Sequence, residues 1–194
     1  MTALAVYTLD EFVKDLQRAF ASHPDLVGRA NAVTEVLEHL LKVGGWVQEM
    51  IDQGGYESLP GAVYTDKEYG HPGPGFHITC GAQKPGQTNA PHDHGAGWVA
   101  YGTYEGAIQQ IRWAWDYSAG VHEPRLVAKE SFVQQPGDVA YFLPGEIHTT
   151  TNTVDRSVVV RVESQKVATL WRHRYLKDGN TARAFMEESV PADH

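Results

Sequence analysis

The sequence predicts a mainly β protein: a barrel of short antiparallel strands preceded by a helical segment. Roughly the first 55 residues carry apolar side chains at helical spacing. From about Leu59 the composition changes, and short runs of Val, Ile, Thr, Tyr, Phe and Trp alternate with Gly, Pro and Asp turns. The turns recur about every ten residues, which is typical of an antiparallel sandwich or barrel.

Composition limits the classes of function. The 194 residues, 42% of them hydrophobic, suffice for one well-buried core and are few for two. The net charge of −8 gives no electrostatic support for binding nucleic acid or an anionic membrane. No apolar run approaches the ~20 residues that cross a bilayer, and the N-terminus lacks the features of a secretory signal. The single cysteine, Cys80, cannot form an intrachain disulfide, so we expect a cytoplasmic protein.

The helical segment, residues 1–58, begins with a capping signal. Thr8-Leu-Asp-Glu11 is a capping box, in which the threonine hydroxyl and the glutamate carboxylate each accept a backbone N–H. The first helix then places Phe12, Val13, Leu16, Ala19 and Phe20 on one face. A second helix is predicted to end at Gly44-Gly45, and a short third one before Gly54-Gly55. We expect these helices to cover one side of the barrel.

The barrel, residues 59–170, is predicted to contain eight strands. They are Ala62–Thr65, Phe76–Ala82, Gly97–Tyr104, Ala107–Trp115, Arg125–Val133, Asp138–Phe142, Glu146–Thr150 and Ser157–Ser164. The Glu105-Gly106 pair between two of them predicts a tight hairpin. Residues 171–194 form a basic and aromatic tail, with a short helix expected from Thr181 to Glu188. This tail is expected to pack against the barrel or a second subunit, so a homodimer is an open alternative.

Three histidines are the candidate metal ligands. His92 and His94 lie in Gly-Gln-Thr-Asn-Ala-Pro-His-Asp-His, and His148 follows in Gly-Asp-Val-Ala-Tyr-Phe-Leu-Pro-Gly-Glu-Ile-His-Thr-Thr-Thr-Asn. In a strand, residues i and i+2 share a face, so both imidazoles would project together with Asp93 turned away. Neutral imidazole suits Fe, Zn, Ni and Cu, and three ligands leave coordination positions open. An isolated His-x-His is as often a surface pair, but the glycines and the second segment favour a metal site.

The same two segments resemble the two sequence motifs of the cupin superfamily. The residues that carry the resemblance are Gly86, His92, His94 and Gly106 in the first motif and Gly137, Gly145, His148 and Asn152 in the second. The slot in which the second motif usually has proline holds Leu143, with Pro144 next to it. The resemblance implies a cupin double-stranded β-helix, which is a jelly-roll barrel.

One departure from the general cupin pattern narrows the resemblance. The glutamate that usually follows the second histidine as a fourth ligand is replaced by Trp98 and Val99. A three-histidine site resembles the thiol dioxygenases, which are cysteine dioxygenase and the bacterial 3-mercaptopropionate dioxygenases. The helical N-terminus and the run Trp-Val-Ala-Tyr-Gly-Thr-Tyr-Glu-Gly after His94 resemble them too. The resemblance implies an Fe(II) cofactor, O2 as a co-substrate and a thiol oxidised to a sulfinate.

Three further departures argue against cysteine as the substrate. Asp66 stands where cysteine dioxygenase has the arginine that holds the substrate carboxylate, and would repel an acid. Val99 replaces the cysteine that crosslinks to a tyrosine. The strand that normally carries a Ser-x-His-x-Tyr triad here has Arg161 and Glu163 at inward positions. These two share a face by strand parity and form either a structural ion pair or the recognition set.

We favour recognition, and take Arg161 and Glu163 as the candidate catalytic residues. Arg161 would hold an acidic or carbonyl oxygen and Glu163 would handle a proton or a donor group. The candidate substrate-binding residues are Asp66, His77, Trp98 and Arg161. For a histidine such as His77, a satisfied core position is the more frequent alternative. Tyr101 is expected to be barrel packing, and Gln110 and Arg112 share a face that either reaches the site or is solvated.

Three functions fit these residues. The first is an Fe(II)-dependent dioxygenase that oxidises a small thiol other than cysteine. The second is a three-histidine dioxygenase that cleaves a C–C bond of a diketone or aromatic ketone, and the third is a cupin that holds a metal and binds a small ligand without catalysis. Zinc, nickel or manganese are alternatives to iron, and zinc would suit a hydrolase. We expect the partners to be a small molecule and O2, with no nucleic acid and no membrane.

Overall fold

The computed structural model of the protein describes residues 6–66, 75–122, 124–178 and 181–187. The described chain begins with three helices, α1 (Leu9–Ser22), α2 (Leu26–Val43) and α3 (Gly45–Gly54), and a 3-10 turn, η1 (Tyr56–Ser58). The capping box is present: the Thr8 hydroxyl accepts from Glu11 N at 3.2 Å, and the Glu11 carboxylate accepts from Thr8 N at 2.8 Å. No helix of the described residues is long and apolar enough to cross a membrane.

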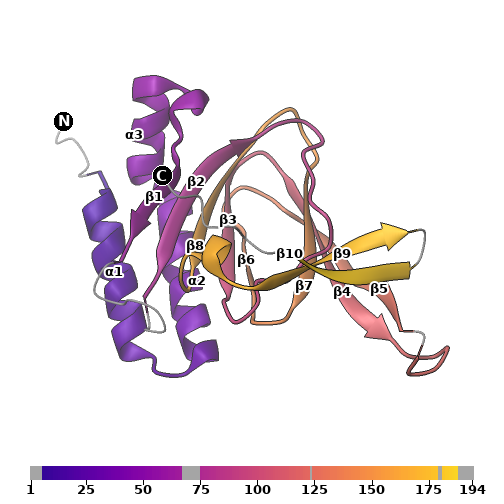
Figure 1. Ribbon diagram of the computed structural model, residues 1–194. Helices are drawn as coiled ribbons and strands as arrows, with labels where there is room; N and C mark the ends of the chain where they lie inside the picture. Colours follow the sequence, from indigo (N-terminus) through magenta and orange to yellow (C-terminus); the bar gives the residue numbers. More distant parts are fainter. Residues whose placement is uncertain (1–5, 67–74, 123, 179–180, 188–194) are drawn as a thin grey trace.

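The helices cover one sheet of the barrel, as Figure 1 shows. Phe12 and Leu16 of α1 and Leu37 of α2 are fully buried in the apolar core between the helices and the sheet. The sheet approaches α2 closely at Gly102, where an added Cβ would lie 2.9 Å from Leu37 Cγ. The helical segment therefore packs on one side of the barrel.

Eight strands form two sheets, all paired antiparallel. The five-stranded sheet has the order β1 (Gly61–Thr65), β2 (His77–Gln83), β8 (Ser157–Glu163), β3 (Val99–Glu105) and β6 (Val139–Phe142). The three-stranded sheet has the order β5 (Arg125–Gln134), β4 (Ile108–Asp116) and β7 (Ile147–Asn152). The predicted mainly β class is confirmed, and the predicted strand boundaries are within two residues of the observed ones.

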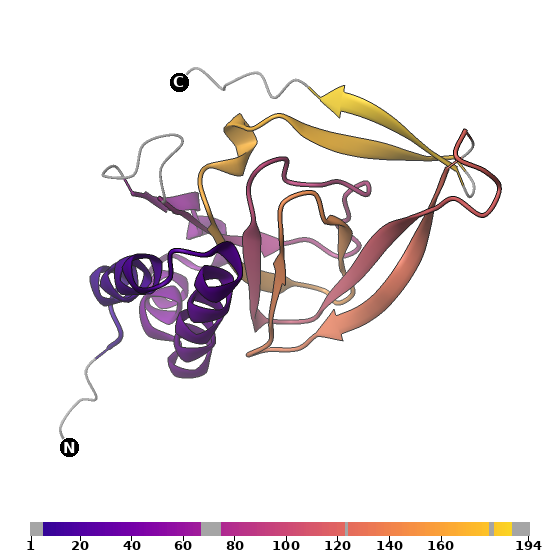
Figure 2. The same ribbon diagram turned by 90° about the horizontal axis from the view of Figure 1, so that it is seen from below.

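The strand order is that of a jelly roll. β3 pairs with β8 and β6, and β4 pairs with β7 and β5, so strands far apart in the sequence are neighbours. The connections from β3 to β4, from β6 to β7 and from β7 to β8 each pass from one sheet to the other. This alternation winds the chain into the double-stranded β-helix that was expected, and Figure 2 shows the two sheets around the barrel interior.

The predicted hairpin at Glu105-Gly106 is wrong. β3 and β4 belong to different sheets, so the chain crosses between sheets at this point instead of folding back on itself. Gly106 has a φ of 83°, and a Cβ there would collide with the carbonyl oxygen of Arg156. Glu105 is held on the outside by the Tyr56 hydroxyl at 2.7 Å and by Arg156 at 3.0 Å.

The helix predicted from Thr181 to Glu188 is also wrong. The described part of this segment is strand β10 (Thr181–Glu187), which pairs along its whole length with β9 (Arg172–Asp178); Glu188 lies outside the described residues. The Asp178-Gly pair in the sequence is a hairpin signal that the helix prediction overlooked. The tail does pack against the barrel, because Tyr175 N donates to Pro91 O at 2.8 Å.

Candidate metal centre

The fold brings His92, His94 and His148 together. His92 and His94 come from the loop before β3, and His148 comes from β7. Each imidazole can offer a ligand atom such that all three atoms lie within 4.8 Å of one another, and the three residues are 7%, 1% and 0% exposed. Nε2 of His94 is 3.4 Å from Nε2 of His148. The three predicted ligands therefore form one buried cluster.

The His-x-His pair was expected in a strand, and that detail is wrong. Residues 91–98 form a loop with isolated bridges in place of a strand: His92 pairs with His148, with N···O distances of 3.0 and 2.9 Å, and also with Arg174. The expected alternation still holds, because Asp93 points away from the cluster toward β9. Its carboxylate accepts from the Tyr175 hydroxyl at 2.9 Å and lies 3.0 Å from His173 Nδ1.

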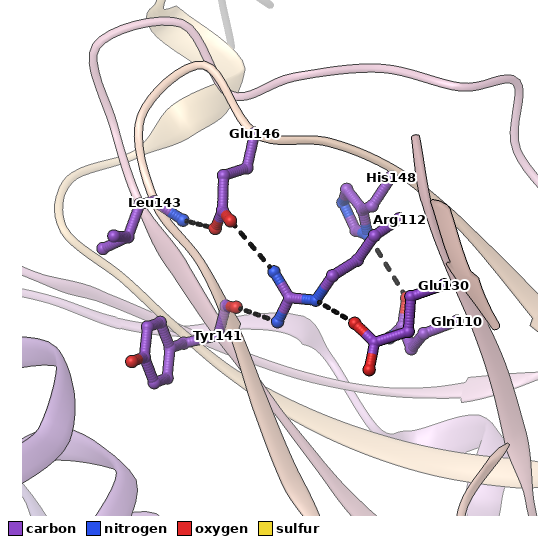
Figure 3. Close-up of polar contacts among 7 residues, drawn as sticks. All are labelled: Gln110, Arg112, Glu130, Tyr141, Leu143, Glu146 and His148. Atoms are coloured by element: carbon purple, nitrogen blue, oxygen red, sulfur yellow. Dashed lines mark hydrogen bonds and ion pairs between the residues drawn. The ribbon is translucent and has the colours of Figure 1, made fainter. Parts of the chain in front are cut away.

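Hydrogen bonds orient two of the imidazoles. His92 Nδ1 lies 3.0 Å from Ala90 O, and His148 Nδ1 lies 3.2 Å from Gln110 Oε1. Both partners are acceptors, so each Nδ1 carries the hydrogen and each Nε2 keeps a lone pair for a metal. Figure 3 shows Gln110 beside His148. From the sequence, Gln110 could either reach the site or lie on a solvated face. Its full burial shows that it belongs to the site.

Arg112, on the same strand, has a structural role. Its guanidinium lies 4.4 Å from the centroid of the Phe142 ring and donates to Tyr141 O at 2.8 Å. It also pairs with Glu146 at 3.1 Å and with Glu130 at 3.4 Å (Figure 3). Phe142 in turn stacks on the His148 imidazole at a centroid distance of 3.9 Å. Arg112 thus fixes the wall behind His148.

The three imidazoles are neutral at ordinary pH. Burial lowers the pKa of His92 to about 4 and lowers the pKa of His94 and of His148 well below the usual range. Nδ1 of His94 is buried without a hydrogen-bond partner among the described residues. Two ligand atoms on a tetrahedral ion with metal–nitrogen distances of about 2.0–2.1 Å lie about 3.3 Å apart, close to the observed separation of the two Nε2 atoms. The residues therefore fit a divalent transition metal.

A cavity of about 290 Å³ opens beside the histidines. Its lining includes His92, His94, Tyr101 and three arginines, Arg161, Arg172 and Arg174. The remaining polar lining residues are hydroxyl or carboxamide side chains, and no aspartate or glutamate lines the cavity in the described part of the chain. The space is suited to a small polar molecule.

Arg161 and Glu163 have different positions relative to this cavity. Arg161 lines it, with Nε donating to Thr79 Oγ1 at 2.8 Å and Nη2 lying 3.5 Å from the Glu163 carboxylate. Glu163 is 2% exposed, lies outside the lining and accepts from Val167 N at 3.1 Å. The residue predicted to recognise substrate thus faces the cavity, whereas its partner supports it from behind.

The other candidate substrate-binding residues lie outside the lining. Asp66 is buried after β1, where its carboxylate accepts from Gln17 Nε2 of α1 at 3.3 Å. His77 Nδ1 is 2.7 Å from Thr65 Oγ1. Trp98 belongs to the core under the helices, with its ring 5.8 Å from that of Phe20. We therefore leave these residues out of the proposed site.

Tyr101 belongs to the site, although the sequence suggested packing. Its hydroxyl is 3.4 Å from His94 Nε2, and its ring centroid is 5.8 Å from the Arg161 guanidinium carbon. Burial raises the pKa of this phenol, so it stays protonated and can donate. Strand pairing could have identified Tyr101 as a site residue. It is opposite Arg161 in the β3–β8 register, which places both side chains on the interior face of the barrel.

Comparison with known proteins does not assign this chain to a family. No protein-family model matches the chain, and no curated protein matches its sequence. Similar solved structures include an uncharacterized protein with a double-stranded beta-helix domain from Klebsiella pneumoniae (15% identity, TM-score 0.39, covering 66% of this chain and 75% of that one). KdgF from Halomonas sp. is another (17%, 0.40, 55% and 81%). Oxalate oxidase is a third (19%, 0.37, 46% and 42%). Identities this low leave the activity to be inferred from the site itself.

Proposed function

We propose that this protein is an Fe(II)-dependent dioxygenase that oxidises a small organic thiol other than cysteine to a sulfinate. The observation that carries the proposal is the cluster of three neutral, buried imidazoles beside a cavity that Arg161 and Tyr101 also line. The overall reaction, R–SH + O2 → R–SO2H, places both oxygen atoms on sulfur and needs no further reductant.

The metal and the protein contribute different parts of this chemistry. When bound, Fe(II) supplies the redox capacity and the coordination positions that three protein ligands leave open. Ala90 O and Gln110 Oε1 hold His92 and His148 in the tautomer that presents Nε2. The barrel core under the site, which includes the fully buried Val99, excludes water from one side.

Arg161 is suited to binding an oxygen of the substrate. Thr79 fixes its Nε and Glu163 lies near one Nη, so the guanidinium is oriented before any ligand arrives. The side chain is 38% exposed, and this exposure is toward the cavity that it lines. A planar group with its remaining N–H donors directed at a ligand binds a carboxylate or carbonyl oxygen well. Glu163 is therefore a positioning residue for Arg161.

Tyr101 provides a hydrogen-bond donor next to His94. Its protonated phenol can donate to an oxygen or sulfur atom of the substrate, or to O2, as negative charge develops there. The lining has no carboxylate among the described residues, so it offers no general base for removing a proton from carbon. A thiol ionises near pH 8.5 and needs no such base to bind as a thiolate.

The test combines metal analysis with O2 consumption. The protein is purified anaerobically, loaded with Fe(II), and supplied in an O2 electrode with a panel of thiols and a panel of β-diketones. We expect O2 uptake with a thiol in a 1:1 ratio to sulfinate, and its loss in His94→Ala. O2 uptake with β-diketones alone would instead support a dioxygenase that cleaves a C–C bond. The absence of uptake with every iron-loaded sample would support a binding protein, and full zinc occupancy from unsupplemented cells would support a hydrolase.

A further inference from the structure

Strand β9 forms one wall of the cavity and is fastened to the loop that carries the histidines. Asp93 N donates to His173 O at 3.1 Å, and Tyr175 N donates to Pro91 O at 2.8 Å. The side chains of His173 and Tyr175 both reach the Asp93 carboxylate. Gly95 lets the two segments approach, because a Cβ there would collide with the carbonyl oxygen of Trp171. The position of β9 is therefore set by the metal-ligand loop.

Strand parity then directs two arginines into the cavity. Successive residues of a strand point to opposite faces, and His173 and Tyr175 are occupied by Asp93. Arg172 and Arg174, on the opposite face, line the cavity together with His92 and His94. These two arginines come from the basic tail that the sequence left without a role.

Arg172 has unfilled hydrogen-bonding capacity. Its Nε is buried and has no hydrogen-bond partner among the described residues. A buried guanidinium donor without a partner costs free energy, so such an atom is expected to face a ligand. Arg161, across the cavity on β8, has the Glu163 carboxylate 3.5 Å away, whereas no carboxylate of the described chain lines the space that the arginines share. The cavity is cationic even before a metal ion adds its charge.

The observed position of Asp66 is compatible with an acidic substrate. Asp66 would repel an acid only if it faced the ligand, but it is buried against α1 and lies outside the lining. Two guanidinium groups on different strands, Arg161 and Arg172, instead offer two separate places for negative charge. A cavity of about 290 Å³ restricts the ligand to a short chain.

We infer that the substrate is a short dicarboxylic acid, with one carboxylate on Arg161 and the second on Arg172 of β9, flanked by Arg174. This assignment rests on the proposed function for the reacting group, which lies between the two acids and next to the histidines. A monocarboxylic acid of the same length leaves one arginine unpartnered and binds more weakly. Strand β9 thus makes the protein prefer a ligand with two carboxylates over a ligand with one.

Three molecules with the same four-carbon chain test the inference. Succinate has two carboxylates, butyrate has one and succinamide has none. Binding of each to EDTA-treated protein is measured by isothermal titration calorimetry, so the readout needs neither metal nor turnover. We expect succinate to bind at least about tenfold more tightly than butyrate, and succinamide not to bind, because each lost charge-assisted hydrogen bond costs roughly a factor of ten or more.

Substitutions assign the second carboxylate to Arg172. Arg172→Gln should reduce succinate binding at least about tenfold and remove its advantage over butyrate, whereas Arg172→Lys should restore part of it. Arg125→Gln makes the same charge change at an exposed position outside the cavity and should leave binding unchanged. Circular dichroism verifies folding, and if Arg172→Gln does not fold, Arg172→Lys and the salt dependence of succinate binding to wild type carry the test.

The outcomes separate this inference from the proposed function. Equal binding of succinate and butyrate to wild type, or undiminished binding of succinate to Arg172→Gln, would overturn the inference. So would the absence of succinate binding to both the metal-free and the zinc-loaded protein. Metal content and O2 uptake are measured on separate samples. If the protein binds succinate as expected but consumes no O2, the anion site is supported and the dioxygenase function is ruled out.

Discussion

Replacing Gln110 with alanine should weaken metal binding without unfolding the protein. Gln110 is fully buried, and its Oε1 accepts from His148 Nδ1 at 3.2 Å and from Thr150 Oγ1 at 3.0 Å. Its Nε2 donates to Gln134 Oε1 at 2.8 Å, and Gln134 in turn donates to Tyr101 O at 3.0 Å. This chain of donors fixes the orientation of the Gln110 amide, so His148 Nδ1 must carry its hydrogen and Nε2 must be free.

The substitution should change both the metal affinity and the stability of the metal-free protein. Loss of a partner that orients a ligating imidazole typically reduces metal affinity about 10- to 100-fold, or about 1.4–2.8 kcal/mol. Each buried group that loses Gln110 as its hydrogen-bond partner lowers the free energy of unfolding by about 1–3 kcal/mol. Relaxation of the structure or an entering water molecule reduces this loss. We therefore expect lower stability of the metal-free protein in addition to weaker metal binding.

The assay is competition for Zn²⁺ or anaerobic Fe(II) against a chromophoric chelator, with urea unfolding of the metal-free protein in parallel. Gln109→Ala is the matched control. Gln109 is adjacent to Gln110 on β4, but its side chain points outward and donates a hydrogen bond to Ser131 Oγ at 3.2 Å. Gln110→Glu keeps an acceptor for His148 and should retain most of the metal affinity. If folded Gln110→Ala binds metal as tightly as wild type does, Gln110 does not orient His148 and the argument fails.

Other substitutions test the remaining parts of the structure. Tyr101→Phe should bind metal normally but turn over about 100-fold more slowly if the phenol donates a proton, and unchanged turnover would return Tyr101 to a packing role. Leu37→Ala should lower the free energy of unfolding by about 2–5 kcal/mol in urea, whereas Glu38→Ala, exposed on the same helix, should change it little. The folded-state pKa of His92, about 4, lies below the unfolded value, so acid favours unfolding. The metal-free protein should lose about 1.4 kcal/mol per pH unit from this group between pH 6.5 and 4, and His92→Gln should make urea-unfolding stability less sensitive to pH.

Sequence patterns predicted the barrel because its strands have local signals. Apolar alternation and turn residues placed all eight barrel strands, and the glycines around His92 and His148 predicted their convergence. The hairpin at Glu105-Gly106 failed for a physical reason: in a jelly roll the partner of β3 is β8, so adjacency in the sequence does not indicate pairing. A local turn signal cannot distinguish a hairpin from a crossing between sheets.

The surroundings of the metal site were less predictable because they depend on contacts between distant segments. Alternation showed that Arg161 and Glu163 share a face, but not that the cavity ends before Glu163. Arg172 belongs to a tail whose role is defined only by its pairing with the loop at His92. Asp66 was placed in the site by resemblance alone, and its contact with Gln17 of α1 places it outside the lining.

The loop of residues 91–98 links the histidine cluster to strand β9. A His-x-His pair in a strand would be aligned by the ladder of one sheet, but here His92 bonds to His148 on one side and Asp93 bonds to β9 on the other. Burial raises the pKa of Asp93, but hydrogen bonds from His173, Gly95 and Tyr175 outweigh it and lower the pKa, so the carboxylate stays charged. Because this charged residue lies between two metal ligands and also holds β9, the contacts that direct the imidazoles to one point also direct Arg172 into the cavity.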